Sequence, residues 1–435
     1  MIETIRAALD KQDRLSAWAI SERQLRSTQL YEVFGKRESI RAVDATTYDV
    51  DLHVPVHLDG RERMGSIRIE IAPGETGIDT RVRRAIESAS VHGNRPFTLP
   101  GGGMTYPDFQ SADPDIVTNP WQVIDDIHES LREEAAKAPD IRISSTEVFV
   151  KYIRQRLVNS RGLDVSQDYT DCLWEIVLFH GRKPEESEFW SIFSRPQWRQ
   201  LNIGEKFGVF AQHARNALVA QTPRSGNCPV VLTGDALEVL YQYMIHHASA
   251  SARFTGSSLF EPGKPVLPDE PLGDRFTMYS NSVIPGGTYS RRFDPDGLPG
   301  GRVRIIHDGV LERFWATRQY AEYLGIEPTG AFTNIELPPG TRSWEELLQS
   351  DDRVILVEQF STFDPQPVAG NYLGEIRVGY EYRADGSVVP LRGGSVTGNV
   401  VSGLTNACFC REMEIFQGYY GPRGVRFEEA QVAGL

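Results

Sequence analysis

Two adjacent histidines, His246 and His247, stand near the end of a helix predicted to begin at residue 235. A zinc peptidase helix carries two histidine ligands about one turn apart and a glutamate that takes a proton from the metal-bound water. In this chain Gln242 stands at the position of the first ligand and Tyr243 at the position of the base. Gln is a poor zinc ligand, and a neutral phenol cannot replace a carboxylate base, so the set is incomplete. We therefore expect the histidines to be structural, with their ring nitrogens bonded to backbone carbonyls.

The start of the same helix carries two acidic residues. Asp235 precedes Glu238 by three positions, which is the spacing of a capping box in which an acid takes the place of Ser or Thr. The sequence therefore predicts that Asp235 caps a single helix that continues to the histidines.

A cysteine pair near the end of the chain offers a second metal chemistry. Cys408 and Cys410 have the spacing that puts both thiols on one face of a strand. With His246 or His247 they could build a soft-metal site, and the chain would then be an active homodimeric metallohydrolase. Strand cysteines are more often buried apolar residues. No nucleophile elbow and no phosphate-binding loop accompanies either arrangement.

Composition limits the classes of partner. The chain has 435 residues, 40 % of them hydrophobic and 24 % charged, with a formal charge of −13, so a nucleic-acid footprint is not expected. No apolar run approaches the length of a membrane span, and residues 1–6 do not open a signal peptide. Four cysteines in so long a chain argue against a disulfide framework. We expect a cytoplasmic protein with no membrane partner.

The order of predicted elements changes in the middle of the chain. Helices are predicted at 2–11, 79–91, 121–138 and 202–221, and extended runs at 15–23, 29–40, 47–58, 64–71, 141–157 and 163–179. After a Thr-Pro-Arg-Ser-Gly turn at 222–226, short extended segments alternate with Gly-rich turns. We predict an α+β protein, with an N-terminal domain of strands and helices (1–221) and a mainly antiparallel β domain, barrel- or sandwich-like (222–435).

The ordered set of motifs in the second half resembles the TldD/TldE (PmbA) proteins, also called the modulator of DNA gyrase family. The strand and helix at 230–247, the segment Ser257–Val266 and the ending Val432-Ala433-Gly434 carry this resemblance. The catalytic members have His-Glu-x-x-x-His on this helix and a third, cysteine ligand near the C-terminus. This chain aligns Gln242, Tyr243 and His247 with the helix motif and has no sulfur in 417–422, so it is similar to the TldE side.

The resemblance implies a role without catalysis by this chain. It implies a heterodimer with a TldD-like catalytic subunit that holds the zinc, no cofactor in this chain, and cleavage of unfolded or small peptides, ribosomally made and modified ones included. No catalytic or metal-binding residue is expected here. A degenerate site that lines the peptide cavity is expected at Gln242, Tyr243, His246 and His247. A peptide-binding scaffold without a peptidase partner remains the other alternative.

Overall fold

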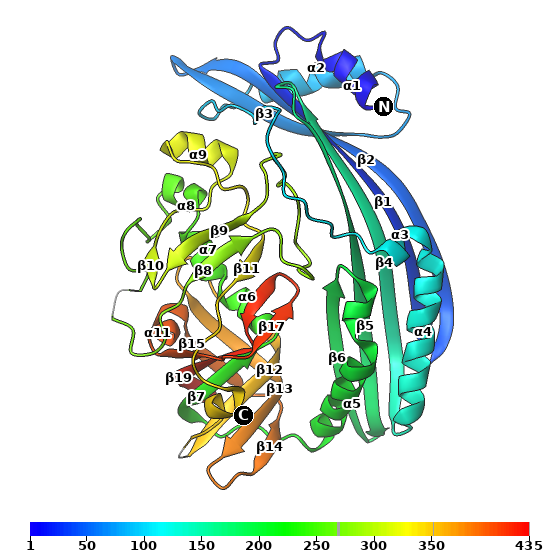
Figure 1. Cartoon of the computed structure of the whole chain (residues 1–435), viewed down its shortest axis with the longest axis vertical. Helices are drawn as coiled ribbons and strands as arrows, with labels where there is room; N and C mark the ends of the chain where they lie inside the picture. The colour runs from blue at the N-terminus through cyan, green and yellow to red at the C-terminus, as the bar shows by residue number, and fades with distance from the viewer. Residues whose placement is uncertain (268–269, 351, 435) are drawn as a thin grey trace.

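The computed structural model describes residues 1–267, 270–350 and 352–434, which form three β-sheets and their covering helices (Figure 1). Every strand of the first sheet precedes helix α5 (Ile203–Val219), and every strand of the other two sheets begins at or after β7 (Gly226–Thr233). The predicted domain boundary at 221/222 falls between these two elements, and it stays a prediction.

The first sheet consists of long antiparallel strands in the order β3-β2-β1-β4-β5-β6. The runs predicted at 47–58 and 64–71 form a hairpin around Asp59-Gly60, and both turn residues have the positive φ values (50° and 70°) that two-residue hairpin turns require. The runs predicted at 15–23 and 29–40 were wrong as separate elements, because one unbroken strand spans 17–33 and the second run crosses the turn at 34–35 into the next strand. The strands are β1 (Ala17–Val33), β2 (Lys36–Leu58), β3 (Arg61–Ile71), β4 (Ile141–Asn159), β5 (Asp164–Arg182) and β6 (Glu185–Arg195).

Helices cover this sheet at two places. At one end α1 (Ile2–Leu9) and α2 (Ile78–Ala89) bury their apolar faces against β1, β2 and β3. Farther along the strands, α4 (Pro120–Lys137) and α5 pack over a core that includes Trp174 and Phe210. The connecting elements are α3 (Pro114–Thr118) and the 3-10 turn η1 (Trp198–Leu201). The predicted helices therefore lie where the 3.6-residue periodicity put them.

A small closed barrel forms the centre of the C-terminal part. Its strands follow the order β12-β7-β19-β15-β13, and the ring closes because β12 also pairs with β13. Among the five strands of this ring, only β7 and β12 are parallel neighbours. Val230 and Leu232 of β7 point into the barrel core, whereas Val231 points outward to a second apolar cluster that contains both Cys408 and Cys410. The strands of this sheet, of which β14 and β16 lie outside the ring, are β12 (Arg353–Phe363), β13 (Asn371–Arg383), β14 (Val388–Leu391), β15 (Ser395–Asn399), β16 (Ala407–Phe409) and β19 (Gly424–Ala433).

A third sheet and several short helices pack around this barrel. The sheet order is β10-β9-β8-β11-β18-β17, formed by β8 (Met278–Asn281), β9 (Arg302–His307), β10 (Val310–Leu311), β11 (Asn334–Glu336), β17 (Met413–Phe416) and β18 (Tyr419–Pro422). The helices are α6 (Asp235–Leu240), α7 (Gln242–His247), α8 (Ala250–Thr255), α9 (Arg318–Leu324), α10 (Trp344–Leu347) and α11 (Val400–Thr405). The predicted α+β class, with a mainly antiparallel and barrel-like second half, is confirmed.

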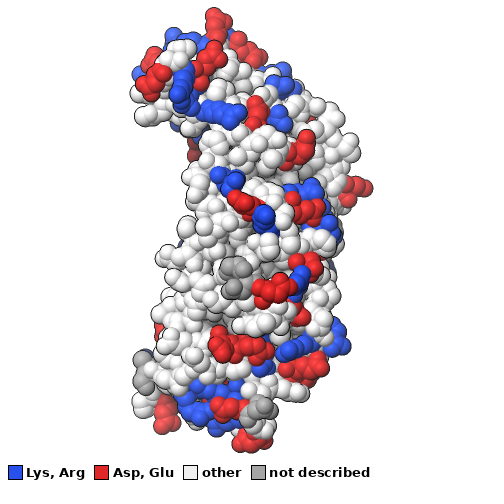
Figure 2. Space-filling model, turned by 90° about the vertical axis from the view of Figure 1, so that its left-hand side faces the viewer, with Lys and Arg blue, Asp and Glu red and all other residues white. Residues whose placement is uncertain are grey.

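The surface of the molecule matches the mixed composition of the chain. On the face displayed in Figure 2, acidic and basic side chains are interspersed. None of the helices in the described ranges combines the length and the apolar character that a membrane crossing would need.

Candidate functional site

The helix that carries the paired histidines is interrupted. Helix α6 ends at Leu240, Tyr241 forms a turn, and α7 begins at Gln242. Tyr241 is fully buried and stacks against Tyr419, with ring centroids 6.0 Å apart. The predicted capping box was wrong: Gly234 is the N-cap, and no side chain caps this end. Gly234 has a φ of +65° and a ψ of −138°, a conformation that only glycine adopts easily. The helix therefore starts at this glycine and not at an acidic capping side chain.

His247 is fully buried, and both of its ring nitrogens are occupied. The backbone N–H of Leu259 donates to Nδ1 (3.1 Å), so this nitrogen carries no proton. Nε2 lies 3.1 Å from the carbonyl of Val368, which can only accept, so Nε2 is the protonated nitrogen. Burial lowers the pKa of His247, which favours the same neutral tautomer. The prediction of structural histidines bonded only to carbonyls therefore needs correction, because one partner is a backbone donor.

The other three predicted site residues lie around His247 in different environments. The ring of Tyr243 is buried 4.4 Å from the His247 ring, between centroids, and it packs beside Gly370. The His246 ring lies 5.0 Å from that of His247, and its Nε2 faces the hydroxyl of Ser257 at 3.5 Å. Gln242 is exposed on the same helix. The rings of Tyr243, His246 and His247 are thus brought together, and their role as a cavity lining stays a prediction.

These residues do not fit a zinc centre. A zinc ligand must present a free lone pair, whereas His247 uses the lone pair of Nδ1 for Leu259 and the proton of Nε2 for Val368. Tyr243 supplies no carboxylate, and burial raises the pKa of its phenol further. Within the described ranges, no group of three or more His, Cys, Asp or Glu side chains is placed to hold a metal ion.

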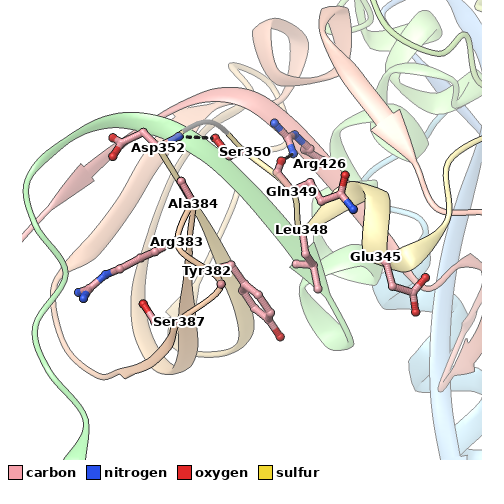
Figure 3. Close-up of a pocket in the computed structure, with 11 residues that line it drawn as sticks. Glu345, Leu348, Gln349, Ser350, Asp352, Tyr382, Arg383, Ala384, Ser387 and Arg426 are labelled. Atoms are coloured by element: carbon pink, nitrogen blue, oxygen red, sulfur yellow. Dashed lines mark hydrogen bonds between the residues drawn. The ribbon is translucent and has the colours of Figure 1, made fainter.

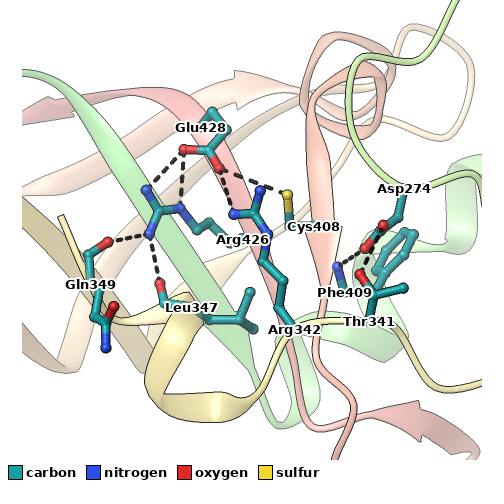
Figure 4. A network of polar contacts seen from close by, with 9 residues as sticks. All are labelled: Asp274, Thr341, Arg342, Leu347, Gln349, Cys408, Phe409, Arg426 and Glu428. Atoms are coloured by element: carbon teal, nitrogen blue, oxygen red, sulfur yellow. Dashed lines mark hydrogen bonds and ion pairs between the residues drawn. The ribbon is translucent and has the colours of Figure 1, made fainter.

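The cysteine pair lies in a different cluster from the histidines. The Cys408 thiol faces the Glu428 carboxylate at 3.8 Å, and that carboxylate also accepts from Arg342 and Arg426 (Figure 4). The Cys410 thiol donates to Glu412 at 2.9 Å. Burial, together with this hydrogen bond, raises the pKa of Cys410 to about 12, and burial also raises that of Cys408. Metal ligation requires thiolates, so this environment favours the buried structural role.

Glu238, which does not cap the helix, turns instead toward the β17–β18 turn. Its Oε2 accepts from the N–H of Gly418 at 3.4 Å, beside the ring of Tyr289. Burial raises the pKa of Glu238 to about 7, the Gly418 bond opposes this, and the nearby Asp235 adds to it. No local sequence pattern indicates this contact, because Gly418 lies 180 residues further along the chain.

The Glu238 carboxyl should make stability depend on pH. Because its folded-state pKa lies above the ordinary value of 4.5, its stabilising contribution is complete below pH 4.5 and is lost as the pH rises through 7. We expect Glu238→Gln to leave the free energy of unfolding nearly unchanged at pH 4.5 and to raise it by roughly 1–2 kcal/mol at pH 8. Urea unfolding at both pH values measures this. The exposed Glu87→Gln is the control, and parallel curves for wild type and Glu238→Gln would contradict the burial of this carboxyl.

Removing the His247 ring should destabilise the fold through its two backbone partners. His247→Ala leaves the N–H of Leu259 and the carbonyl of Val368 without their partner, at an expected cost of about 1–3 kcal/mol. Thermal and urea unfolding measure the loss. A change of the same size in His92→Ala, an exposed position, would show that the effect is not specific to this environment.

A large open pocket at one end of the barrel lies apart from these residues. It has a volume of about 940 Å3 and is lined by residues of α10 and of the β13–β14 turn, among them Tyr382, Arg383 and Ser387 (Figure 3). Its most buried cation, Arg426, is saturated by the carbonyls of Leu347 and Gln349 and by Glu428. Among the described residues that line it, the pocket therefore offers no free buried charge to a ligand.

Comparison with known proteins agrees with this architecture. Residues 225–434 match the PmbA/TldA metallopeptidase C-terminal domain. A zinc metalloprotease TldD homolog of Saccharolobus solfataricus is 23 % identical over 314 residues, which cover 67 % of this chain and 68 % of that protein. A metalloprotease of Methanothermobacter thermautotrophicus is 26 % identical over 220 residues, and the match spans 47 % of this chain and 46 % of that relative.

A solved structure extends the similarity to the whole fold. TldE from Thermococcus kodakarensis superposes with a TM-score of 0.83 over 100 % of both chains, at 15 % sequence identity. The matched C-terminal domain, the metalloprotease relatives and the common fold agree with one another. Residues 225–434 form a PmbA/TldA metallopeptidase C-terminal domain, and the chain has homologues among the TldD and PmbA metalloproteases.

Proposed function

We propose that this chain is a TldE-like, non-catalytic subunit of a metalloprotease that cleaves unfolded or small peptides. In this proposal a TldD-like partner subunit holds the zinc, and this chain holds none. One observation carries the proposal: the only histidine aligned with a zinc ligand, His247, already uses both ring nitrogens within its own fold. The matched metallopeptidase C-terminal domain supports a peptidase context, and four free thiols suit a reducing compartment such as the cytoplasm.

The absence of a base beside the metal position supports this division of labour. In a zinc peptidase the glutamate after the first histidine activates the water, and Tyr243, a buried phenol with a raised pKa, cannot replace it. Loss of a general base lowers a rate by about 100-fold or more. The partner must therefore contribute both the ligands and the base. This chain would contribute walls and contacts that hold the peptide.

The test is co-expression with a TldD-like chain from the same genome, followed by cleavage assays of each chain alone and of the mixture. We expect the two chains to co-purify and an unfolded peptide to be cleaved at least about 100-fold faster by the mixture than by this chain alone. Replacing the partner's zinc-ligand histidines should abolish cleavage. Equal activity of this chain by itself would instead identify the homodimeric hydrolase, and failure to pair with any such chain would favour a scaffold.

A further inference from the structure

A groove of about 350 Å3 separates the first sheet from the barrel. One wall is the edge strand β6 with helix α5 behind it, and the opposite wall includes the edge strand β17. Arg195 of β6 bridges the two strands by donating to the carbonyl of Ile415 at 2.8 Å. The groove therefore lies between two sheet edges that belong to different parts of the chain and are linked by this hydrogen bond.

The edge of β6 leaves one residue with free backbone groups inside this groove. The carbonyl of Trp190 accepts from Gln359 Nε2 (3.1 Å), and the carbonyl of Ser194 accepts from the hydroxyl of Thr288 (3.2 Å). Because backbone groups alternate in direction along a strand, the N–H and C=O of Ile192 between them face the same way. Neither has a hydrogen-bond partner in the described part of the chain, and Ile192 lines the groove. An unpaired strand edge is a template for another strand.

A second unmet group lies beside this edge. The amide of Gln359 donates to Trp190, but its Oε1 is buried and has no partner among the described residues. A buried acceptor without a donor is unfavourable, and an N–H from a ligand would satisfy it. Gln359 is also among the residues that line the groove, although its Oε1 itself is buried.

The side chains of the groove select the kind of strand that fits. Its apolar lining includes Phe189, Val378 and Phe416, and its charged lining contains four carboxylates against one lysine and one arginine. One carboxylate, Glu358, is paired with Nε2 of His213 at 3.0 Å, and the Tyr380 hydroxyl lies 2.8 Å from Nδ1 of the same ring. This set favours alternating apolar and cationic side chains.

We propose that this groove binds an extended peptide segment as an added strand on β6, with its backbone paired to Ile192 and a basic side chain near the groove's carboxylates. The proposal rests on the proposed function, because it identifies where this chain would hold a peptide for the catalytic partner. In strand addition, main-chain hydrogen bonds hold the peptide, and pockets receive every second side chain of the peptide.

The test measures binding of a fluorescein-labelled Val-Lys-Val-Lys-Val-Lys peptide to this chain alone by fluorescence anisotropy. Two altered peptides test the two parts of the proposal. We expect a peptide with N-methyl groups on alternate amides, and a peptide in which Glu replaces every Lys, each to bind about tenfold more weakly or worse. Ile192→Pro removes the outward N–H from an edge strand, where proline is tolerated, and should weaken binding by about tenfold. Glu414→Lys should also weaken binding of the Lys-containing peptide, because it replaces a carboxylate of the groove by a positive charge. The exposed Glu87→Lys is the matched control.

Equal affinity for the N-methylated peptide, or unchanged binding by both Ile192→Pro and Glu414→Lys, would overturn the proposal. Circular dichroism of each variant separates a loss of binding from a loss of fold. Since no partner subunit is present in this assay, a failure here leaves co-purification and cleavage by the mixed chains unaffected. A failure of those assays likewise leaves peptide binding to this groove measurable.

Discussion

Replacing Arg353 by Met is expected to lower the free energy of unfolding by about 1.5–3 kcal/mol, because it removes the buried partner of a buried carboxylate and leaves that carboxylate only the partly exposed Arg383. Arg353 and Glu381 have side chains that are 5 % and 2 % exposed, and they lie 3.3 Å apart on neighbouring strands of the barrel. Burial raises the pKa of Glu381, but bonds from Arg383 and Arg353 more than offset this and hold the pKa below its usual range. Urea unfolding at pH 7 measures the loss.

Two further variants make this prediction specific. Adding Glu381→Leu to Arg353→Met removes the buried carboxylate that has lost its buried partner and should recover most of the lost stability, because the remaining Arg383 is 40 % exposed. Arg156→Met breaks an ion pair with Asp164 of similar length (2.7 Å), but those side chains are 39 % and 53 % exposed, so the expected change is below about 1 kcal/mol. Equal losses in the buried and exposed pairs would show that burial does not govern the effect.

Truncating Trp174 to Ala is expected to cost about 3–5 kcal/mol, because it opens a cavity in the core between the first sheet and its helices. The ring is fully buried and lies 5.6 Å from Phe193 and 5.7 Å from Phe210, between centroids. Its indole N–H also donates to Thr146 at 3.1 Å, so truncation leaves a buried hydroxyl without this partner. Thermal unfolding followed by near-ultraviolet circular dichroism measures the change.

The chain offers a matched tryptophan as the control. Trp121 lies in the first turn of α4 and is 47 % exposed, so Trp121→Ala should change the free energy of unfolding by about 0.5 kcal/mol or less. A loss of comparable size at both positions would contradict the assignment of Trp174 to the centre of this core.

Elements set by neighbouring residues were predictable from the sequence. The hairpin around Asp59-Gly60 follows from alternation and turn chemistry, and the short helix at Trp344 begins with a capping box made by two residues three positions apart, Ser343 and Glu346. The closed barrel could not be derived in the same way. Its parallel pair joins Val230 to Ile355, more than a hundred residues apart, and no local periodicity encodes that pairing.

The candidate site likewise combines features that the local sequence predicts with features that depend on distant residues. Residue types alone indicated that Gln242 and Tyr243 cannot supply a ligand and a base. The contacts that fix His247, to Leu259 and to Val368, come from segments 12 and 121 residues away. Sequence patterns carry no information on such tertiary hydrogen bonds. The helix start failed for a local reason, because Gly234 in a glycine-specific conformation begins α6 without a side-chain cap.

The central claim, that the helix around His247 holds no catalytic zinc, is tested most directly by metal analysis of the purified chain. After dialysis against zinc and removal of free metal, inductively coupled plasma mass spectrometry should find far less than about one zinc per chain, with no peptide hydrolysis. About one zinc per chain, lost together with hydrolytic activity in His247→Ala, would contradict it.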